Sequence, residues 1–218
     1  MGDRYFVTLP RTAPGMRIGL LGGSFNPAHE GHRHVSLEAM ARLDLTQVWW
    51  LVSPGNPLKS HAGLAAQDAR LAAAAKIAYH PRITVTGLES ALGTPFTAET
   101  LDFLITRAPN VRFVWLMGAD NLASFHRWRE WRGIMQTVPV AVFDRPGWRY
   151  RALASRAATA FAAARLPEAE SRNLAGRQTP AWCFLSIPLS PLSSTALRAR
   201  KIPAIPPSGP ARRAPDTG

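Results

Sequence analysis

Short apolar runs alternate with helix-forming stretches along most of this chain. An apolar run of roughly four to eight residues, bounded by Gly, Pro or polar residues, is typical of a strand buried on both faces. Longer stretches that are rich in Ala, or that carry apolar side chains three to four residues apart, favour helices. The predicted strands are residues 16–21, 47–52, 83–86, 111–117, 138–143 and 182–187. The predicted helices are residues 31–43, 65–79, 97–107, 150–165 and 194–200.

This alternation predicts an α/β fold of the Rossmann-like, doubly wound type, with one parallel sheet, helices on both faces and a single domain. Right-handed crossovers bring the carboxyl ends of the strands to one edge of the sheet. Ligands of open parallel sheets bind at that edge. We therefore expect the chemistry directly after Leu21, Val52, Met117 and Ile187.

We assign residues 16–201 to one folded domain, for which 218 residues are sufficient. Residues 1–15 and 202–218 are rich in Pro, Arg or small residues, and we expect a mobile arm and a disordered Pro-rich tail. No stretch has the ~18 consecutive apolar residues of a membrane span, and residues 1–15 lack the apolar segment of a signal peptide. The single cysteine, Cys183, lies among apolar neighbours, as a buried thiol in a reducing compartment would. We expect a cytoplasmic protein.

The chain is strongly basic, with 26 Lys and Arg against 14 Asp and Glu and a formal net charge of +12. Nearly all of the cations are arginines, since only Lys59, Lys76 and Lys201 are lysines. Such an excess favours anionic partners, either nucleic acids or phosphorylated metabolites. The arginines are scattered rather than gathered in a run, so a general compositional bias explains the charge equally well. A basic nucleic-acid-binding domain therefore stays open as a non-enzymatic alternative.

The segment between the first strand and its helix carries the strongest chemical signal. It reads GGSFNPAHEGH from Gly22 to His32. Adjacent glycines let the backbone turn tightly and let a ligand approach main-chain N–H groups. His29 and His32 are three residues apart at a helix start, where unpaired N–H groups and a partial positive charge suit phosphate. We expect this junction to face solvent, with imidazoles that donate hydrogen bonds and become cationic as negative charge builds up.

Other motifs that contain Gly or His fit this segment less well. The dinucleotide fingerprint G-x-G-x-x-G has another glycine spacing, and a Walker P-loop ends in Lys followed by Ser or Thr. The run HEGH is one residue shorter than the metalloprotease motif H-E-x-x-H. With one cysteine and no dense cluster of His and Asp beside the pair, we predict no metal held by the protein itself. The position of the pair favours phosphate binding.

The same segment resembles the signature G-G-[ST]-F-[DN]-P-x-H-x-G-H of the HxGH nucleotidyltransferase superfamily. A second segment, LSSTALR at residues 192–198, is similar to that superfamily's motif I-S-S-T-x-[IL]-R. Both motifs in this order are far more specific than either alone. Further matches resemble the bacterial nicotinate-mononucleotide adenylyltransferases of this superfamily: Pro54, Pro57, Lys59, Arg70, residues 94–101, Gly118-Ala119-Asp120, Trp128 and Arg145-Pro146-Gly147. The resemblance covers about residues 16–200.

The resemblance implies adenylyl transfer from ATP to nicotinate mononucleotide, which gives nicotinate adenine dinucleotide and pyrophosphate. It implies catalytic roles for His29, His32, Lys59 and Arg198. It implies that ATP and its phosphates are bound by Gly22, Gly23, Ser24, Phe25, Ser193, Ser194, Thr195 and Arg198. It implies contacts to the nicotinate nucleotide for Thr97, Asp120 and Trp128, with the Trp128 indole stacked on the pyridine ring.

The phosphate of the mononucleotide is the nucleophile of that reaction, so no protein nucleophile is required. Catalysis then consists of positioning and charge neutralisation, helped by Mg²⁺ bound mainly through ATP. The implied partners are ATP and nicotinate mononucleotide, with no nucleic acid and no membrane, and the oligomeric state is left open. Within the superfamily, nicotinamide mononucleotide or phosphopantetheine is the alternative acceptor.

Several of these residues also have ordinary structural explanations. Lys59 and Arg198 can be solvated surface charges, Asp120 can cap a helix and Trp128 can pack in the core. We expect surface or loop positions for His34, His61, His80 and His126, and core positions for Trp49 and Trp50. The chain also departs from the family, because Pro95-Phe96 replaces the usual Ser-Tyr and residues 201–218 lack the family's further helical stretch.

Overall fold

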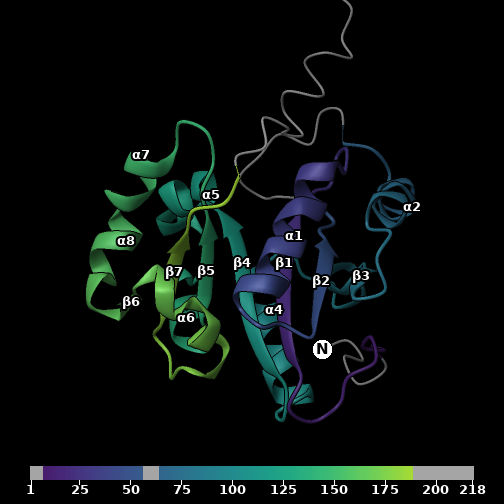
Figure 1. Cartoon of the computed structure of the whole chain (residues 1–218). Coiled ribbons are helices and arrows are strands. Elements are labelled where there is room, and N and C mark those ends of the chain that lie inside the picture. Colours follow the sequence, from purple (N-terminus) through teal and green to yellow (C-terminus); the bar gives the residue numbers. More distant parts are fainter. Residues whose placement is uncertain (1–6, 56–63, 189–218) are drawn as a thin grey trace, which may run out of the picture.

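The computed structural model describes residues 7–55 and 64–188. Their framework is a seven-stranded sheet of order β3-β2-β1-β4-β5-β7-β6, in which all neighbouring strands are parallel. The strands are β1 (Arg17–Gly23), β2 (Gln47–Val52), β3 (Ile83–Thr86), β4 (Arg112–Gly118), β5 (Val140–Phe143), β6 (Arg165–Leu166) and β7 (Trp182–Leu185). In Figure 1 the strands run upward, so their carboxyl ends meet along the upper edge of the sheet. The strand order reverses at β1, between β2 and β4, and such a switch point is where open α/β sheets bind ligands.

Helices cover both faces of this sheet (Figure 1). One face carries α1 (Glu30–Arg42), α2 (Gln67–Ile77) and the 3-10 segment η4 (Glu168–Gly176), whose buried side chains pack with one set of strand residues. The other face carries α3 (Leu88–Ala91), α4 (Thr97–Arg107), α5 (Ala119–Ser124), α6 (Trp131–Thr137), α7 (Arg149–Leu153) and α8 (Arg156–Ala160). The short 3-10 turns η2 (Phe125–Arg127) and η3 (Ala162–Ala164) join elements on this second face. The expected doubly wound fold is confirmed.

Neighbouring strand residues enter opposite cores, because side chains of a strand alternate between its two faces. Trp49 packs in the core beneath α4 and Trp50 in the core beneath α1, and both are fully buried. Their predicted role as core residues is confirmed. Cys183, on β7, is likewise fully buried, and burial raises the pKa of its thiol to about 12.

The single helix predicted over residues 150–165 is wrong. The chain forms two short helices there, α7 and α8, followed by η3 and the edge strand β6. Ser155 causes the break: its backbone is extended, and its side chain accepts a hydrogen bond from the N–H of Ala158 as the N-cap of α8. The Ala-rich composition correctly indicated helix, but one good capping residue divided it.

Some sequence predictions lie outside the described residues, namely the helix at 194–200, the tail at 202–218 and residues 1–6 of the first arm. Residues 7–15 of that arm contain no helix or strand, and Val7 and Leu9 pack against the core. Across residues 7–55 and 64–188, no helix combines the length and the apolar character that crossing a membrane requires.

Candidate active site

The loop after β1 turns directly at the switch point of the sheet. A Cβ at Gly22 would come within 2.5 Å of Cη2 of Trp115 on β4, so the close approach of strand and indole requires glycine. Phe25 has a φ of 46°, in the left-handed region that costs a non-glycine residue about 1–3 kcal/mol. Its buried ring stacks on Trp50 at a centroid distance of 5.0 Å, and this packing holds the strained residue in place.

His29 and His32 lie beside this turn, at the start of α1. The backbone N–H of His29 donates to Nδ1 of His32 at 3.2 Å, and the two ring centroids are 3.9 Å apart. Because a backbone N–H can only donate, Nδ1 of His32 is an acceptor, and the neutral ring carries its hydrogen on Nε2. Nδ1 of His29 is buried and has no partner among the described residues. The pair therefore leaves a ring N–H and an unpartnered ring nitrogen for a ligand.

Both imidazoles are neutral at physiological pH. Burial, with a smaller contribution from Arg145, lowers the pKa of His29 from 6.5 to about 4. Burial also dominates for His32, where His29 and then Arg145 lower the pKa further, to about 3. The expectation that the pair faces solvent is wrong for His29, which is 5% exposed. Burial opposes protonation of both rings in the ligand-free protein, because a buried imidazolium loses its hydration.

Arg145 supplies the permanent cation near the histidines. It follows β5, and its Nε lies 3.3 Å from Oδ1 of Asp120, which follows β4. The carboxylate of Asp144 accepts the backbone N–H of Arg145 at 2.8 Å and fixes this loop. A Cβ at Gly118 would collide with Asp120, so the pair depends on glycine at the end of β4. The sequence motif included Arg145, but the electrostatic role follows only from the fold.

A cavity of about 300 Å³ opens beside the turn, between the carboxyl ends of β1 and β4 and the start of α4. Gly22, Gly23 and Ser24 line one part of it, and Thr97 and Trp128 line another. Thr97 is the first residue of α4, so its backbone N–H is one of the first-turn donors that have no acceptor within the helix. The cavity thus joins a glycine turn to a helix N-terminus.

Trp128 belongs both to the core and to the cavity. Its half-buried indole packs edge-on against Trp115 and Phe125, at centroid distances of 6.2 and 5.2 Å, while lining the cavity. Its backbone N–H already donates to the carbonyl of Phe125 at 2.9 Å. The next amide, that of Arg129, has no acceptor among the described residues and is the donor beside Trp128 that a ligand can use.

Arg70 holds two loops of the site together from α2. Its guanidinium is buried, with the residue only 3% exposed, and burial lowers its pKa. Nη1 donates to the carbonyls of Ser24 and Ser53, both at 2.7 Å, and Nε donates to Ala65 at 2.9 Å. The loop after β1 and the loop after β2 are therefore fixed relative to each other by one side chain.

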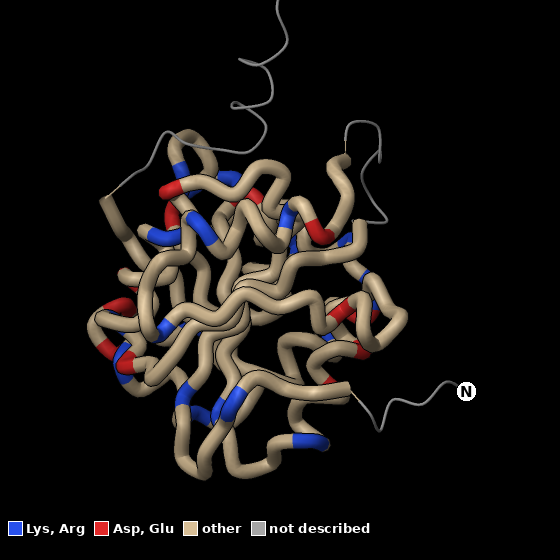
Figure 2. The backbone as a smooth tube through the Cα atoms, turned by 90° about the vertical axis from the view of Figure 1, so that its right-hand side faces the viewer, with Lys and Arg blue, Asp and Glu red and all other residues tan. Residues whose placement is uncertain are grey.

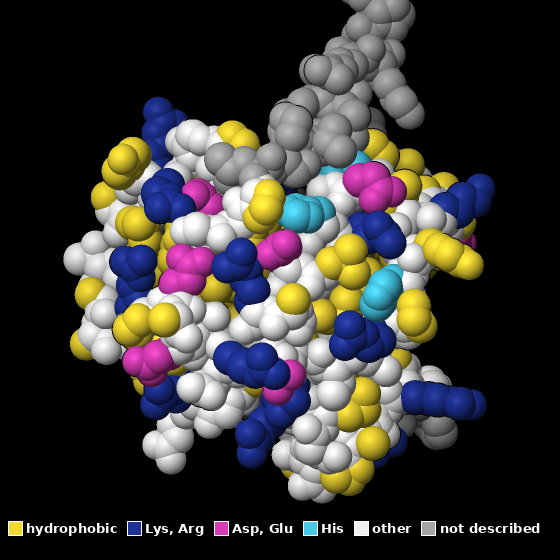
Figure 3. All heavy atoms as spheres, in the orientation of Figure 1, with side chains coloured by type: hydrophobic (Ala, Val, Ile, Leu, Met, Phe, Trp, Pro, Cys, Tyr) yellow, Lys and Arg dark blue, Asp and Glu magenta, His cyan; other side chains and the backbone are white. Residues whose placement is uncertain are grey.

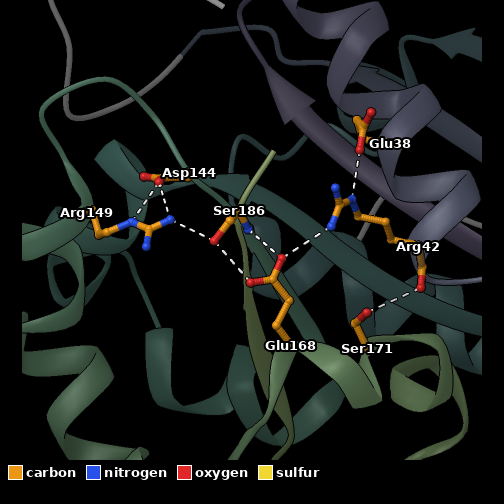
Figure 4. Close-up of polar contacts among 7 residues, drawn as sticks. All are labelled: Glu38, Arg42, Asp144, Arg149, Glu168, Ser171 and Ser186. Carbon is orange, nitrogen blue, oxygen red and sulfur yellow. Dashed lines mark hydrogen bonds and ion pairs between the residues drawn. The ribbon is translucent and has the colours of Figure 1, made fainter. Parts of the chain in front are cut away.

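A second polar network fixes the chain where β7 ends (Figure 4). Ser186 donates its backbone N–H to Oε1 of Glu168 at 2.9 Å and its hydroxyl to Oε2 at 3.0 Å. The same hydroxyl accepts from Arg149, which pairs with Asp144 at 2.7 Å, and Glu168 also accepts from Arg42 of α1 at 3.3 Å. The network links α1, η4, α7 and the ends of β5 and β7, immediately before the described chain stops at residue 188.

Comparison with known proteins identifies the family. A model of the family described as Cytidylyltransferase-like matches residues 20–200. A protein of Methylorubrum extorquens named "probable nicotinate-nucleotide adenylyltransferase" is 59% identical over 185 residues, 85% of this chain and 100% of that protein. The chain belongs to the nicotinate-nucleotide adenylyltransferase family. A protein of the same name from Cereibacter sphaeroides is 58% identical over 84% of this chain and 97% of its own length.

A solved structure supports the fold of this member of the family. The Plasmodium falciparum nicotinic acid mononucleotide adenylyltransferase, solved in complex with NaAD, aligns with a TM-score of 0.63 and covers 84% of this chain and 83% of its own. The sequence identity is 18%, so the likeness concerns the architecture of the sheet and its helices.

The fold brings part of the predicted site together. Gly22, Gly23, Ser24, Thr97 and Trp128 line one cavity, while Phe25, His29 and His32 adjoin its glycine turn and Asp120 pairs with Arg145. Lys59, Ser193, Ser194, Thr195 and Arg198 lie outside the described residues. The roles of all these residues stay predictions.

The structure adds residues that sequence patterns did not single out. Glu89 and Trp115 line the cavity although they stand in an ordinary helical and an ordinary strand pattern. His126, expected to be a surface or loop residue, is half-buried, and its Nδ1 has no partner among the described residues. His34 contacts the carbonyl of Pro188 through Nε2 at 3.0 Å, His80 accepts from the N–H of Arg82, and His61 lies outside the described residues.

Proposed function

We propose that this enzyme transfers the adenylyl group of ATP to nicotinate mononucleotide, giving nicotinate adenine dinucleotide and pyrophosphate. An oxygen of the mononucleotide's phosphate attacks the α-phosphorus of ATP. The bond from that phosphorus to the oxygen bridging to the β-phosphate breaks, and pyrophosphate leaves with the electron pair. One observation carries the proposal: the turn with the glycines and histidines opens into a cavity lined by aromatic side chains, and the N-terminus of α4 lies at that cavity.

The phosphates of ATP lie at the turn in this proposal. Main-chain N–H groups of the segment Gly22–Phe25 contact them, and the Nε2–H of His32 donates to an oxygen on which charge builds up in the transition state. Neutral donors of this kind act without changing protonation state, and Arg145 contributes the fixed charge. Lys59, Ser193, Ser194, Thr195 and Arg198 complete the phosphate site by family resemblance.

The acceptor nucleotide occupies the cavity. The N-terminus of α4 at Thr97 and the backbone N–H of Arg129 hydrogen-bond the nicotinate carboxylate, since neither donor has an acceptor among the described residues and the helix end carries a partial positive charge. The indole of Trp128 stacks on the pyridine ring. Asp120, held by Arg145, contacts a ribose or the nucleotide. We further propose that the enzyme works in the cytoplasm, whose reducing conditions suit the free thiol of Cys183.

Magnesium enters this proposal with ATP. Residues 7–55 and 64–188 contain no group of three or more His, Cys, Asp or Glu that could hold a metal ion. Mg²⁺ prefers phosphate oxygens and water as ligands, so in this proposal ATP itself supplies most of the coordination. Such an ion would neutralise charge on the phosphates, while Arg145 and the turn orient them.

The charge distribution gives less support to a nucleic-acid-binding domain. In Figure 2 acidic and basic positions are mixed over the upper and middle parts of the fold, and on the face in Figure 3 the Lys and Arg side chains are interspersed with Asp and Glu. A continuous basic stripe is the usual footprint of nucleic-acid binding. Pyrophosphate release from ATP that depends on an added mononucleotide distinguishes the enzyme from the binding domain.

The choice between acid and amide tests the acceptor. A carboxylate offers two acceptor oxygens to the amides of Thr97 and Arg129, whereas nicotinamide turns an NH₂ donor toward one of them. A buried donor left unpaired costs about 1–3 kcal/mol, and the charge assistance is lost as well. We expect nicotinate mononucleotide to be favoured over nicotinamide mononucleotide by at least about 100-fold in kcat/KM, measured by competition at fixed ATP.

Trp128→Ala provides the control for that competition. Loss of stacking should weaken both acceptors, but much of the ratio should persist because the backbone donors remain. Equal use of acid and amide by the wild type would refute the nicotinate assignment. Activity only with 4′-phosphopantetheine would mean that the enzyme uses another class of acceptor known in the same superfamily.

A further inference from the structure

Glu89 is a buried carboxyl group with an unused oxygen. It lies on α3, is 3% exposed and lines the acceptor cavity. Its backbone carbonyl accepts the N–H of Thr94 at 3.0 Å, but its side-chain Oε2 has no partner among the described residues. Burial raises the pKa of the carboxyl from 4.5 to about 8, so the group is mostly neutral at pH 7. An unpaired buried polar group is costly, and at a cavity wall it indicates a missing ligand.

Trp115 is the second such group in the same cavity. Its Nε1 is buried without a partner among the described residues, and the residue lines the cavity. One part of its indole lies against Gly22 of the phosphate turn, and its ring packs edge-on against Trp128 at 6.2 Å. Trp115 therefore spans the distance between the turn that receives phosphate and the aromatic residue that receives the pyridine ring.

The chemistry of the two groups selects the kind of ligand atom. An indole N–H can only donate, whereas a neutral carboxyl can both donate and accept. A sugar hydroxyl also both donates and accepts, so it can satisfy either group or both. The sugar of a mononucleotide joins its phosphate to its base, which places it opposite Trp115 when phosphate is at Gly22 and the ring is at Trp128.

We propose that Glu89 and Trp115 form a polar subsite that hydrogen-bonds the ribose hydroxyls of the acceptor mononucleotide. The subsite rests on the proposed function, since it presumes a nucleotide in this cavity. Glu89 contacts the substrate there and determines specificity for an intact ribose, while the anionic ends of the acceptor are held at the glycine turn and at the start of α4. Oε2 of Glu89 and Nε1 of Trp115, which have no partner among the described residues, then gain hydrogen-bond partners only when the acceptor is bound.

The test combines acceptor analogues with protein variants. Nicotinate mononucleotide, its 2′-deoxy form and its 3′-deoxy form are compared as acceptors of the wild type, Glu89→Gln, Glu89→Leu and Trp115→Phe, with KM for ATP as an internal reference. On the wild type, at least one deoxy acceptor should lose about tenfold in kcat/KM, mainly through KM. Glu89→Gln keeps a neutral donor and acceptor and should retain that loss. Glu89→Leu should bind the intact acceptor about tenfold more weakly. Its kcat/KM for the intact acceptor should exceed that for the deoxy acceptor by less than about threefold.

Ser90→Ala is the matched control, because this exposed neighbour on α3 hydrogen-bonds Gln67 and does not line the cavity. It should discriminate the deoxy acceptors like the wild type. Two outcomes overturn the subsite: wild-type kcat/KM within twofold for all three acceptors, or the same deoxy penalty in Glu89→Leu as in the wild type. The first needs no variant, so poor folding of Glu89→Leu does not remove the test. A wild type that releases no pyrophosphate with any of these acceptors refutes the proposed function instead.

Discussion

A histidine pair beside a phosphate can act through positive charge or through neutral hydrogen bonding, and its enclosure decides between the two. The rings of His29 and His32 are packed against each other, and His32 also packs against Phe25 at 4.7 Å. With pKa values near 4 and 3, they remain neutral while Arg145 remains charged. The site therefore separates hydrogen-bond donation from charge, assigning each to a different residue.

Removal of a ring donor should affect turnover more than substrate binding. We expect His32→Ala to lower kcat about 10²- to 10³-fold with a smaller change in KM for ATP, since in the proposed mechanism the lost donor contacts charge that develops in the transition state. Because the ring is packed, the melting temperature must be measured alongside. Arg33 is the control, because its partly exposed side chain on the same helix pairs with Glu30 at 3.8 Å, and Arg33→Ala should keep kcat within about twofold. A fully active His32→Ala enzyme would exclude the phosphate role.

Arg70 is the residue whose loss should most disturb the site without contacting substrate. In Arg70→Met, the carbonyls of Ser24, Ser53 and Ala65 lose their donor, and each buried unpaired carbonyl is costly. We expect the free energy of unfolding in urea to fall by at least about 2 kcal/mol. Arg107→Met, at an exposed position near the end of α4, should change it by less than about 0.5 kcal/mol. Equal effects of the two variants would contradict the role of Arg70.

At the scale of elements, the strands were the most predictable part of the chain. Residues 47–52 and 83–86 form β2 and β3 with the predicted bounds, because a strand buried on both faces needs a continuous apolar run. The helix 97–107 was predicted with the bounds of α4. Short elements such as α5 and α6 were missed, since six or seven residues carry too little periodicity to separate helix from loop.

Site residues that belong to a sequence motif could be predicted, whereas residues whose properties arise from packing could not. The turn at residues 22–32 has a recognisable spacing of glycines and histidines. Glu89 has none: its carboxyl is unusual because the folded chain buries it at the wall of the cavity. The burial of His29 was missed for the same reason, since enclosure is a property of the folded chain.

The network at the end of β7 should matter for stability beyond one element. Glu168→Leu removes the acceptor of both Ser186 donors and of Arg42, so we expect the free energy of unfolding to fall by about 1–3 kcal/mol (Figure 4). Glu170→Leu is the control, because Glu170 also lies on η4 but, among the described residues, pairs only with the exposed Arg177. That pair should contribute less than about 1 kcal/mol. Chemical denaturation of both variants measures the difference, and equal values would contradict the network's role.

For the whole molecule, buried ionisable groups at the site predict how stability depends on pH. Burial lowers the pKa values of His29 and His32 from 6.5 to about 4 and 3. Their contribution to the free energy of unfolding is therefore fully present above pH 6.5 and is lost as pH falls through 4 and 3. The pKa of Glu89 is raised from 4.5 to about 8, so its contribution is present below pH 4.5 and is lost as pH rises through 8.

These opposed contributions favour maximal stability near pH 6.5. Between about pH 4.5 and 6.5 the unfolded chain binds two more protons on its histidines and the native chain one more on Glu89, so stability rises with pH. Between about pH 6.5 and 8 only Glu89 differs in proton binding between the two states. Stability then falls with pH, because the unfolded chain binds fewer protons than the native one. Glu89→Gln removes this titration and keeps the size of the side chain. We therefore expect the difference in melting temperature, variant minus wild type, to increase steadily from pH 4.5 to 8 and then to level off. Scanning calorimetry at fixed ionic strength measures it, and subtraction cancels every group that the two proteins share. Parallel curves would mean that Glu89 titrates alike in both states, so that burial of its carboxyl has no energetic consequence.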